Sequence, residues 1–217
     1  ILFADDAGEP ALVPHEGRAC GFYWTEGIRG LGWAVEAIPT LKGGSTIGIS
    51  SPPAIWIPDA PVGHRIVTPD VRDGERLQGF PADWTRAVPG GRPGARWKLV
   101  GNAVTVDAAA WIGERMVTPG TYGSGDDRLL TKKCKWPNAA WCFEPGRRFA
   151  AAVSAWPRRV PAPPLAQFLQ FETKPLSPRA TAGFFGRTKV SGLRFPDGFL
   201  DAIEEHLDAV SGQTGPA

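Results

Sequence analysis

Residues 65–81 of this chain read RIVTPDVRDGERLQGFP and carry several helix signals that agree with one another. Thr68 can cap a helix whose first residue is Pro69, because a proline at that position has no N–H that would need a partner. Acidic side chains in the first turn favour the positive end of the helix, and Gly79 suits its end. The stretch therefore predicts one short helix over residues 69–78.

The sequence before this helix is rich in β-formers and broken by turns. Short β-type runs occur at residues 21–24, 47–49 and 54–57, with glycine or proline pairs between them. Residues 1–60 therefore predict a small β-rich fold with long loops.

Two further helices are expected after the helix at 69–78. A Gly/Pro loop is followed by residues 96–104, which read RWKLVGNAV and lead into an alanine-rich helix over residues 106–115, with Thr105 as its cap. An acidic amphipathic helix is expected near residues 197–210, because its apolar residues fall on one face.

Charge is strongly segregated in this chain, although its net charge is only +2. Residues 128–194 contain 13 Lys and Arg and two acidic residues, whereas the sequence on either side is net acidic. Such a basic run is either a solvated surface or a face that neutralises phosphates. Interleaved Trp and Phe residues favour the second interpretation, because aromatic rings beside Arg can stack or wedge against bases.

The composition of the 217 residues, 42% hydrophobic and 21% charged, is typical of a soluble globular protein. There is no run of about 18 apolar residues that could span a membrane, and no signal-peptide pattern at the N-terminus. Three irregularly spaced cysteines do not predict a disulfide framework, which indicates a cytoplasmic protein. Since the first residue is Ile1 and Met116 is the sole methionine, we expect a part of a longer protein or a processed one.

Residues 65–81 resemble motif IX of the cytosine-5 DNA methyltransferases, which runs Arg-x-Leu-Thr-Pro and then Arg-Glu-x-x-Arg-Leu-Gln-Gly-Phe-Pro. Here Asp73 stands where Glu is usual, and Asp70 and Val71 are extra. Further along, residues 101–104 resemble motif X of the same family, Gly-Asn-[Ser/Ala]-Val followed by a helix. The two motifs occur in the order that the family requires.

The resemblance implies an α+β chain in three parts. Residues 1–90 would form a small, β-rich target-recognition domain with short helices. Residues 91–118 would form a motif X segment whose helix belongs to a Rossmann-like catalytic domain outside this chain. Residues 119–217 carry no family motif, and we expect a loop-rich, basic, Trp/Pro-rich C-terminal extension that ends in the acidic helix.

The motif X resemblance implies that Gly101, Asn102, Ala103 and Val104 line part of the pocket for the methyl donor, S-adenosylmethionine. Free N–H groups at a helix N-terminus would suit a polar ligand tail. The alternative is that the Gly-Asn pair is only a turn that caps the helix.

Double-stranded DNA is the partner that the motif IX resemblance implies. Small residues on a Gly-rich loop let the backbone approach DNA, and Lys or Arg can reach phosphates or guanine edges; a solvent-exposed hairpin loop is the alternative. The candidate DNA-binding residues lie in the loop before motif IX, in motif IX and in the basic run: Arg29, Thr40, Leu41, Lys42, Gly43, Gly44, Ser45, Arg65, Arg72, Arg76, Gln78, Arg147 and Arg148.

The groups that would carry out methylation are missing from this sequence. The family attacks a flipped cytosine with the thiolate of a Pro-Cys pair and uses the carboxyl group of a Glu-Asn-Val segment. Here Cys20, Cys134 and Cys142 follow Ala, Lys and Trp, and there is no Glu-Asn pair. No metal site is expected, because Cys134 and Cys142 lack two further ligands.

We therefore expect the DNA-recognition part of a DNA (cytosine-5-)-methyltransferase, as found in restriction-modification systems, which is inactive by itself. The nucleophile would come from the N-terminal catalytic region of the same enzyme or from a separate catalytic subunit. The alternative is a non-catalytic DNA-binding or partner-binding protein derived from a methyltransferase.

Overall fold

The structure is a computed structural model that describes residues 6–25, 27, 32–44, 52–88, 92–131 and 134–212. It divides into two compact units. The first, here called the sheet unit, comprises Val13–Val106 and Pro163–Ala217; the second, the hairpin unit, comprises Ile1–Leu12 and Asp107–Ala162. The division differs from the boundaries at 90 and 118 expected from the sequence, because the chain leaves the sheet unit after motif X and returns to it.

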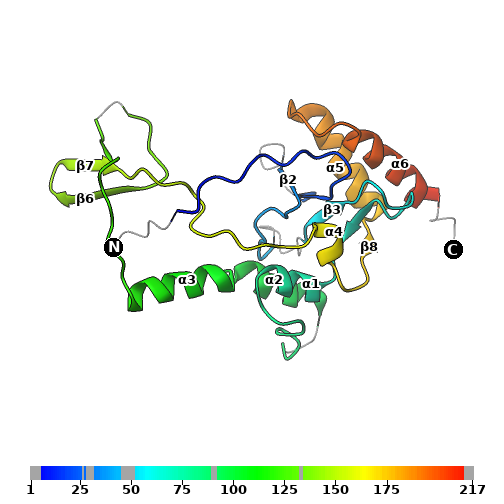
Figure 1. The fold of residues 1–217 in the computed structure, drawn as a ribbon. Coiled ribbons are helices and arrows are strands. Elements are labelled where there is room, and N and C mark those ends of the chain that lie inside the picture. The colour runs from blue at the N-terminus through cyan, green and yellow to red at the C-terminus, as the bar shows by residue number, and fades with distance from the viewer. Residues whose placement is uncertain are drawn as a thin grey trace. The chain divides into compact units, whose positions relative to one another are not determined.

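A five-stranded antiparallel sheet forms the centre of the sheet unit (Figure 1). The strand order is β2-β1-β3-β4-β8. The strands are β1 (Cys20–Phe22), β2 (Trp33–Val35), β3 (Ala54–Trp56), β4 (Ile66–Thr68) and β8 (Lys174–Pro175). The predicted strands at 21–24 and 54–57 are thus confirmed as three-residue strands, β1 beginning one residue earlier than expected, and the one at 47–49 lies outside the described residues.

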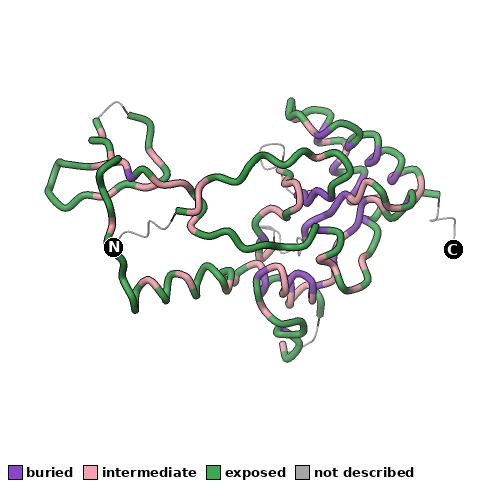
Figure 2. The backbone as a smooth tube through the Cα atoms, in the orientation of Figure 1, coloured by how far each residue is buried: buried purple, intermediate pink, exposed green. Residues whose placement is uncertain are grey.

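Both faces of this sheet are buried, because successive side chains of a strand point to opposite faces. Trp56 and Ile66 pack on one face against Phe184 of α5 (Pro178–Ser191) and Phe199 of α6 (Phe199–Gly212). Ile55 and Val67 pack on the other face against Leu165 of α4 (Leu165–Phe168) and Leu77 of α1 (Val71–Leu77). The buried residues in Figure 2 accordingly concentrate on the sheet and on the helix sides that face it.

The C-terminal third of the chain completes the sheet unit. β8 pairs with β4, and the backbone N–H of Leu176 donates to the carbonyl of Ile66 at 2.9 Å. The predicted acidic helix is confirmed as α6, whose apolar face covers the sheet. Sequence reasoning expected a loop-rich extension here because β8 has two residues, too few for a recognisable strand pattern.

The mixture of helices and an antiparallel sheet confirms the α+β class. The predicted helix at 69–78 is confirmed as α1, but its N-cap is Asp70 and not Thr68, since the Asp70 carboxylate accepts the backbone N–H of Arg72 at 2.9 Å. The alanine-rich helix is confirmed as α3 (Val106–Val117). An additional helix, α2 (Pro93–Asn102), begins at the end of the expected Gly/Pro loop and contains most of residues 96–104, for which no helix was predicted.

The hairpin unit contains α3 and a three-stranded antiparallel sheet of order β5-β7-β6. Its strands are β5 (Arg128–Leu129), β6 (Ala140–Glu144) and β7 (Arg147–Ala150). Among the residues described in this unit, Ala151 alone is buried, so the unit has almost no core of its own. In the described part of the whole chain, no helix has the length and apolar character needed to cross a membrane.

Candidate functional site

The predicted DNA-reading loop is held on α1 and α2 by Leu41. This side chain is buried in a cluster with Val71 of α1 and with Trp97 and Val100 of α2. Its neighbours Thr40 and Lys42 are exposed. Leu41 therefore anchors the loop, while Thr40 and Lys42 remain on the surface.

The same loop touches the segment that resembles motif X. A Cβ built on Gly101 would lie 2.0 Å from the carbonyl carbon of Lys42, and one built on Gly43 would lie 2.0 Å from Oδ1 of Asn102. Glycine is thus required at position 101, where the neighbouring atoms belong to the backbone, whereas at position 43 they belong to the Asn102 side chain, which can move aside. The residues predicted to read DNA and those predicted to line the donor pocket meet at one place in the sheet unit.

Asp73 and Arg76 of α1 connect motif IX to the C-terminal part of the chain. The Asp73 carboxylate is fully buried and accepts the backbone N–H groups of Gln170 and Phe171, both at 3.1 Å. Arg76 donates to Asp73 at 2.6 Å and to the carbonyl of Phe168 at 2.7 Å, and its guanidinium lies over the Phe168 ring. This motif IX arginine therefore has an internal structural role.

Glu75, on the same helix, anchors the loop that follows motif IX. Its buried carboxylate accepts the backbone N–H and the hydroxyl of Thr85 and pairs with Arg96 of α2 at 2.9 Å. Burial alone would raise the pKa of Glu75, but the hydrogen bonds from Thr85 and Arg96 outweigh it and hold the pKa below its usual value.

Gln78 joins α1 to both helices of the motif X region. Its side-chain amide donates to the carbonyl of Val100 at 3.0 Å and accepts the hydroxyl of Thr105 at 2.8 Å, while its backbone carbonyl accepts the N–H of Val106. Because Gln78 is buried and its amide is satisfied at both ends, its position fits a structural role in the sheet unit.

The other motif IX candidates are partly exposed and have partners within the sheet unit. Arg65 pairs with Glu205 at 2.6 Å and donates to the carbonyl of Ala60. Arg72 pairs with Asp70 at 2.8 Å and lies over the ring of Phe171. Surface ion pairs of this kind are weak, so either arginine can exchange its partner for a phosphate. The candidates Arg29 and Ser45 lie outside the described residues; Gly44 is described and half-buried.

Gly101–Val104 present a different surface from the one expected. Gly101 and Asn102 form the last turn of α2, and the N–H of Ala103 is already bonded to the carbonyls of Leu99 and Val100. They therefore do not offer free N–H groups at a helix N-terminus. What they can offer a methyl donor is the exposed Asn102 carboxamide and the exposed Val104 side chain, which would form one wall of a pocket.

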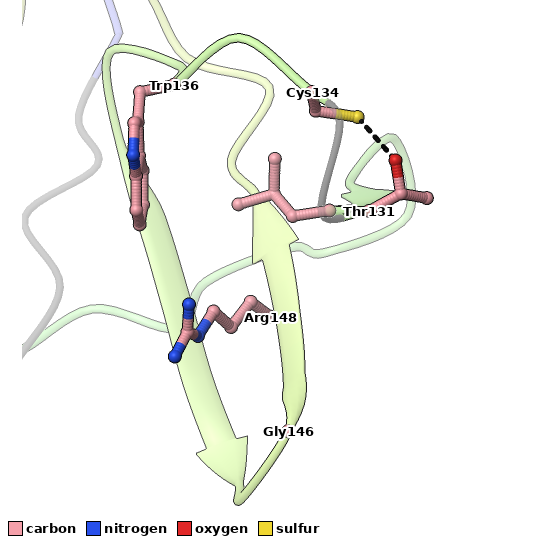
Figure 3. Close-up of a pocket in the computed structure, with 6 residues that line it drawn as sticks. Thr131, Cys134, Trp136, Gly146 and Arg148 are labelled. Carbon is pink, nitrogen blue, oxygen red and sulfur yellow. Dashed lines mark hydrogen bonds between the residues drawn. The ribbon is translucent and has the colours of Figure 1, made fainter.

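Arg147 and Arg148 lie on β7 of the hairpin unit. Arg147 is highly exposed and pairs with Glu144 at 3.0 Å. Arg148 lines a pocket of about 280 Å³ together with Trp136, Cys134, Thr131, Leu130 and Gly146 (Figure 3). The Thr131 hydroxyl and the Cys134 thiol lie 3.0 Å apart at its edge.

The three cysteines differ in their surroundings. Cys20 is buried in the sheet, and this burial, with the nearby Glu36 carboxylate, raises the pKa of its thiol to about 11. Cys134 is exposed, and its hydrogen bonds with Thr131 lower the pKa of its thiol. Within the described ranges, no cluster of three or more His, Cys, Asp and Glu side chains is arranged to hold a metal ion.

Sequence reasoning missed the residues of α2 that hold the candidate site together. Trp97 packs so closely on α1 that a Cβ at Gly74 would lie 2.5 Å from its ring, and Arg96 supplies the buried ion pair with Glu75. Pro93 is the first residue of this helix, and a proline at that position is a known start signal. The glycines on both sides of Pro93 made this helix start resemble a loop.

Comparison with known proteins identifies a methyltransferase relative. The chain is 42% identical over 220 residues to the Type II methyltransferase M2.BsuMI of Bacillus subtilis (strain 168), and the match covers 96% of this chain and 55% of that protein. The chain thus spans about half the length of the curated relative that it matches. No family model matches the chain. No solved structure matches it either.

Proposed function

We propose that this chain is the DNA-recognition part of a DNA (cytosine-5-)-methyltransferase, which transfers a methyl group from S-adenosylmethionine to carbon 5 of cytosine in duplex DNA. The single observation that carries the proposal is the contact of Gly101 and Asn102 with Lys42 and Gly43. It joins a segment like motif X to the loop before motif IX, an arrangement that would place the residues that read bases beside those that line the donor pocket.

The relative supports the methyltransferase part of this proposal. It is named as a Type II methyltransferase, and its additional length leaves room for a catalytic region. In this proposal that region supplies the thiolate and most of the donor site, either in the same protein or as a separate subunit, within a restriction-modification system. S-adenosylmethionine supplies the methyl group, and Asn102 and Val104 contribute one wall of its pocket.

Helix α3 supports a missing protein partner independently. None of its described residues is buried, although Ile112, Met116 and Val117 are apolar and exposed. A helix with an uncovered apolar stripe is stabilised when another element packs on it. The catalytic region is the proposed occupant of this stripe.

In the sheet unit, the proposal assigns contact with DNA to the exposed residues Thr40 and Lys42. Arg65 and Arg72, at the surface of motif IX, would contact phosphates. Leu41, Arg76 and Gln78 instead hold these residues in place, because their side chains are engaged inside the unit.

A reconstituted methylation assay tests this proposal. The chain, alone and mixed with a polypeptide that carries the missing region, would be incubated with tritiated S-adenosylmethionine and mixed-sequence duplex DNA, and the modified base would be identified by mass spectrometry. We expect 5-methylcytosine only in the mixture. A Gly101→Val variant should abolish it, because the side chain would displace the Lys42–Gly43 backbone. Methylation of adenine or of a cytosine amino group, or no methylation in the mixture, would refute the proposal.

A further inference from the structure

The hairpin unit exposes large aromatic rings on a strongly basic segment. Trp136 is 73% exposed and Phe143 is 88% exposed. Residues 128–148 contain six Lys and Arg and a single acidic residue, Glu144. Exposed aromatic surface indicates a binding partner, and the charge indicates that this partner is anionic.

The pocket at Trp136 pairs an aromatic ring with a guanidinium group. Figure 3 shows the Trp136 indole at one side of the pocket and the Arg148 guanidinium below it, and both groups line the same space of about 280 Å³. Leu130 adds an apolar surface and Thr131 a hydroxyl. A flat apolar wall beside a cation suits a ligand that is itself a flat ring attached to an anion.

The same pairing occurs a second time on the hairpin, around Arg147. The rings of Trp141 and Phe149 are stacked with their centroids 4.5 Å apart, and the ring centroids of Trp141 and Phe143 lie 5.0 Å apart. The Arg147 guanidinium lies 5.6 Å from the centre of the Phe149 ring. Two successive arginines of β7 thus each lie beside an aromatic surface of their own, a combination typical of surfaces that bind the bases and phosphates of one strand.

We infer that the pocket between Trp136 and Arg148 binds an unpaired nucleotide of a DNA strand, with the base against the Trp136 ring and the phosphate on the Arg148 guanidinium. Within a duplex both faces of each base are covered by its neighbours, so the indole can stack only on a base that has left the helix. The inference rests on the proposed function only in taking DNA as the nucleic acid.

Binding of the complete 217-residue chain to a labelled oligothymidylate and to a duplex of the same length, followed by fluorescence anisotropy, tests this inference. We expect the single strand to bind more tightly. Trp136→Ala should weaken its binding roughly five- to a hundredfold, the range for the loss of one stacked base, whereas Trp136→Phe should retain most of it. Arg148→Ala should reduce the slope of log K against log salt concentration by about one.

Trp156→Ala is the matched control, because Trp156 belongs to the same unit, is 47% exposed and does not line the pocket. It should bind the oligonucleotide as the parent chain does. Alkylation of Cys134, measured by mass spectrometry with and without the oligonucleotide, gives a second test that does not depend on a substitution. The bound oligonucleotide should protect Cys134 from the alkylating reagent. Protection of Cys134 by the catalytic region without DNA would overturn the inference, since a protein surface would then cover the pocket.

Three other results would also overturn it: equal affinity for duplex, an unchanged affinity of Trp136→Ala, or tighter binding of an RNA of the same length. The proposed function fails separately. Lys42→Ala in the recognition loop should impair methylation and specific duplex binding but leave binding of oligothymidylate unchanged. Conversely, an enzyme that fails to methylate cytosine would leave the result with the single strand intact.

Discussion

Gly101 lies directly against the backbone of Lys42. A Cβ at position 101 would come within 2.0 Å of the Lys42 carbonyl carbon and within 2.3 Å of the Gly43 nitrogen. Both contacts are with backbone atoms, which cannot move aside as a flexible side chain can. The position of the loop that contains Thr40 and Lys42 is therefore set by the last turn of α2.

Gly101→Ala should destabilise the sheet unit and displace this loop. We expect the free energy of unfolding to fall by about 1–3 kcal/mol, as for other overpacked sites, and specific duplex binding to fall with it. Denaturant unfolding and a binding titration measure the two effects. The matched control is Gly113→Ala in α3, where a Cβ would meet no atom within 4 Å; it should leave stability unchanged or raise it by about 0.5–1 kcal/mol. Equal stability of the two variants would show that the close contact is not present in solution.

Asp73→Ala should cost clearly more stability than Asp70→Ala, a change of another acidic residue in the same segment. The substitution leaves Arg76 without its partner and leaves two backbone N–H groups, those of Gln170 and Phe171, without an acceptor. Loss of one member of a largely buried pair costs about 3–5 kcal/mol. Urea unfolding of the purified chain gives the value.

Asp70→Ala is the control for this prediction. Asp70 lies on the same helix but is partly exposed and serves as the N-cap, so its loss should cost about 1 kcal/mol. If Asp73→Ala cost no more than Asp70→Ala, the segment at residues 168–171 would not be held by motif IX.

The sequence predicted the helices with strong local signals. Residues 68–79 carry the expected cap Thr68, acidic first-turn residues and a terminal glycine, and residues 106–115 carry an alanine run; both helices are present, the first with Asp70 as its cap. It could not predict β8, because a two-residue strand is defined by its partner β4 and not by its own pattern. It also assigned residues 163–212 to an extension, since packing between distant segments leaves no local signature.

The candidate site was predictable in outline only. Thr40 and Leu41 were both predicted to bind DNA, but Leu41 is buried and Thr40 is exposed, and a sequence does not state which side of a loop faces the core. Likewise Arg76 and Gln78 are polar motif residues whose partners, Phe168 and Val100, are distant in the sequence. Whether such residues face DNA or the protein depends on tertiary contacts.

The free energy of unfolding should decrease as the pH falls below about 6.5, because His206 is protonated more readily in the unfolded chain. His206 belongs to α6 and its ring is buried; Nε2 hydrogen-bonds with the carbonyl of Leu176 at 2.9 Å, and Nδ1 has no partner among the described residues. Burial lowers the pKa of His206, and the proximity of His64 adds to this effect. His206 therefore binds a proton more readily in the unfolded chain than in the folded one. The stabilisation that depends on neutral His206 is complete at pH values above its pKa in the unfolded chain, and it is lost as the pH falls through its pKa in the folded chain.

The free energy of unfolding, measured by urea denaturation at a series of pH values from 7 to 5, tests this prediction. His206→Gln should lower the free energy of unfolding at pH 7. It should also reduce the slope of the free energy of unfolding against pH by up to about 1.4 kcal/mol per pH unit. An unaltered slope in His206→Gln would assign the acid sensitivity to other groups.

Cys134 should be alkylated much faster than Cys20. The hydrogen bonds with Thr131 lower the pKa of the Cys134 thiol, whereas burial and Glu36 raise the pKa of Cys20 to about 11. The thiolate is the reacting species, so at neutral pH Cys134 has the larger reactive fraction and is also accessible. The rate of iodoacetamide labelling, measured over a pH series by peptide mass spectrometry, should reach half its maximum at a much lower pH for Cys134 than for Cys20.

Thr131→Val should raise the pH of half-maximal labelling of Cys134, because it removes the side-chain hydrogen bond. Thr118→Val, elsewhere in the hairpin unit, should not change it. A midpoint that stays in place in Thr131→Val would mean that the hydroxyl does not stabilise the thiolate, and the edge of the Trp136 pocket would then be arranged differently.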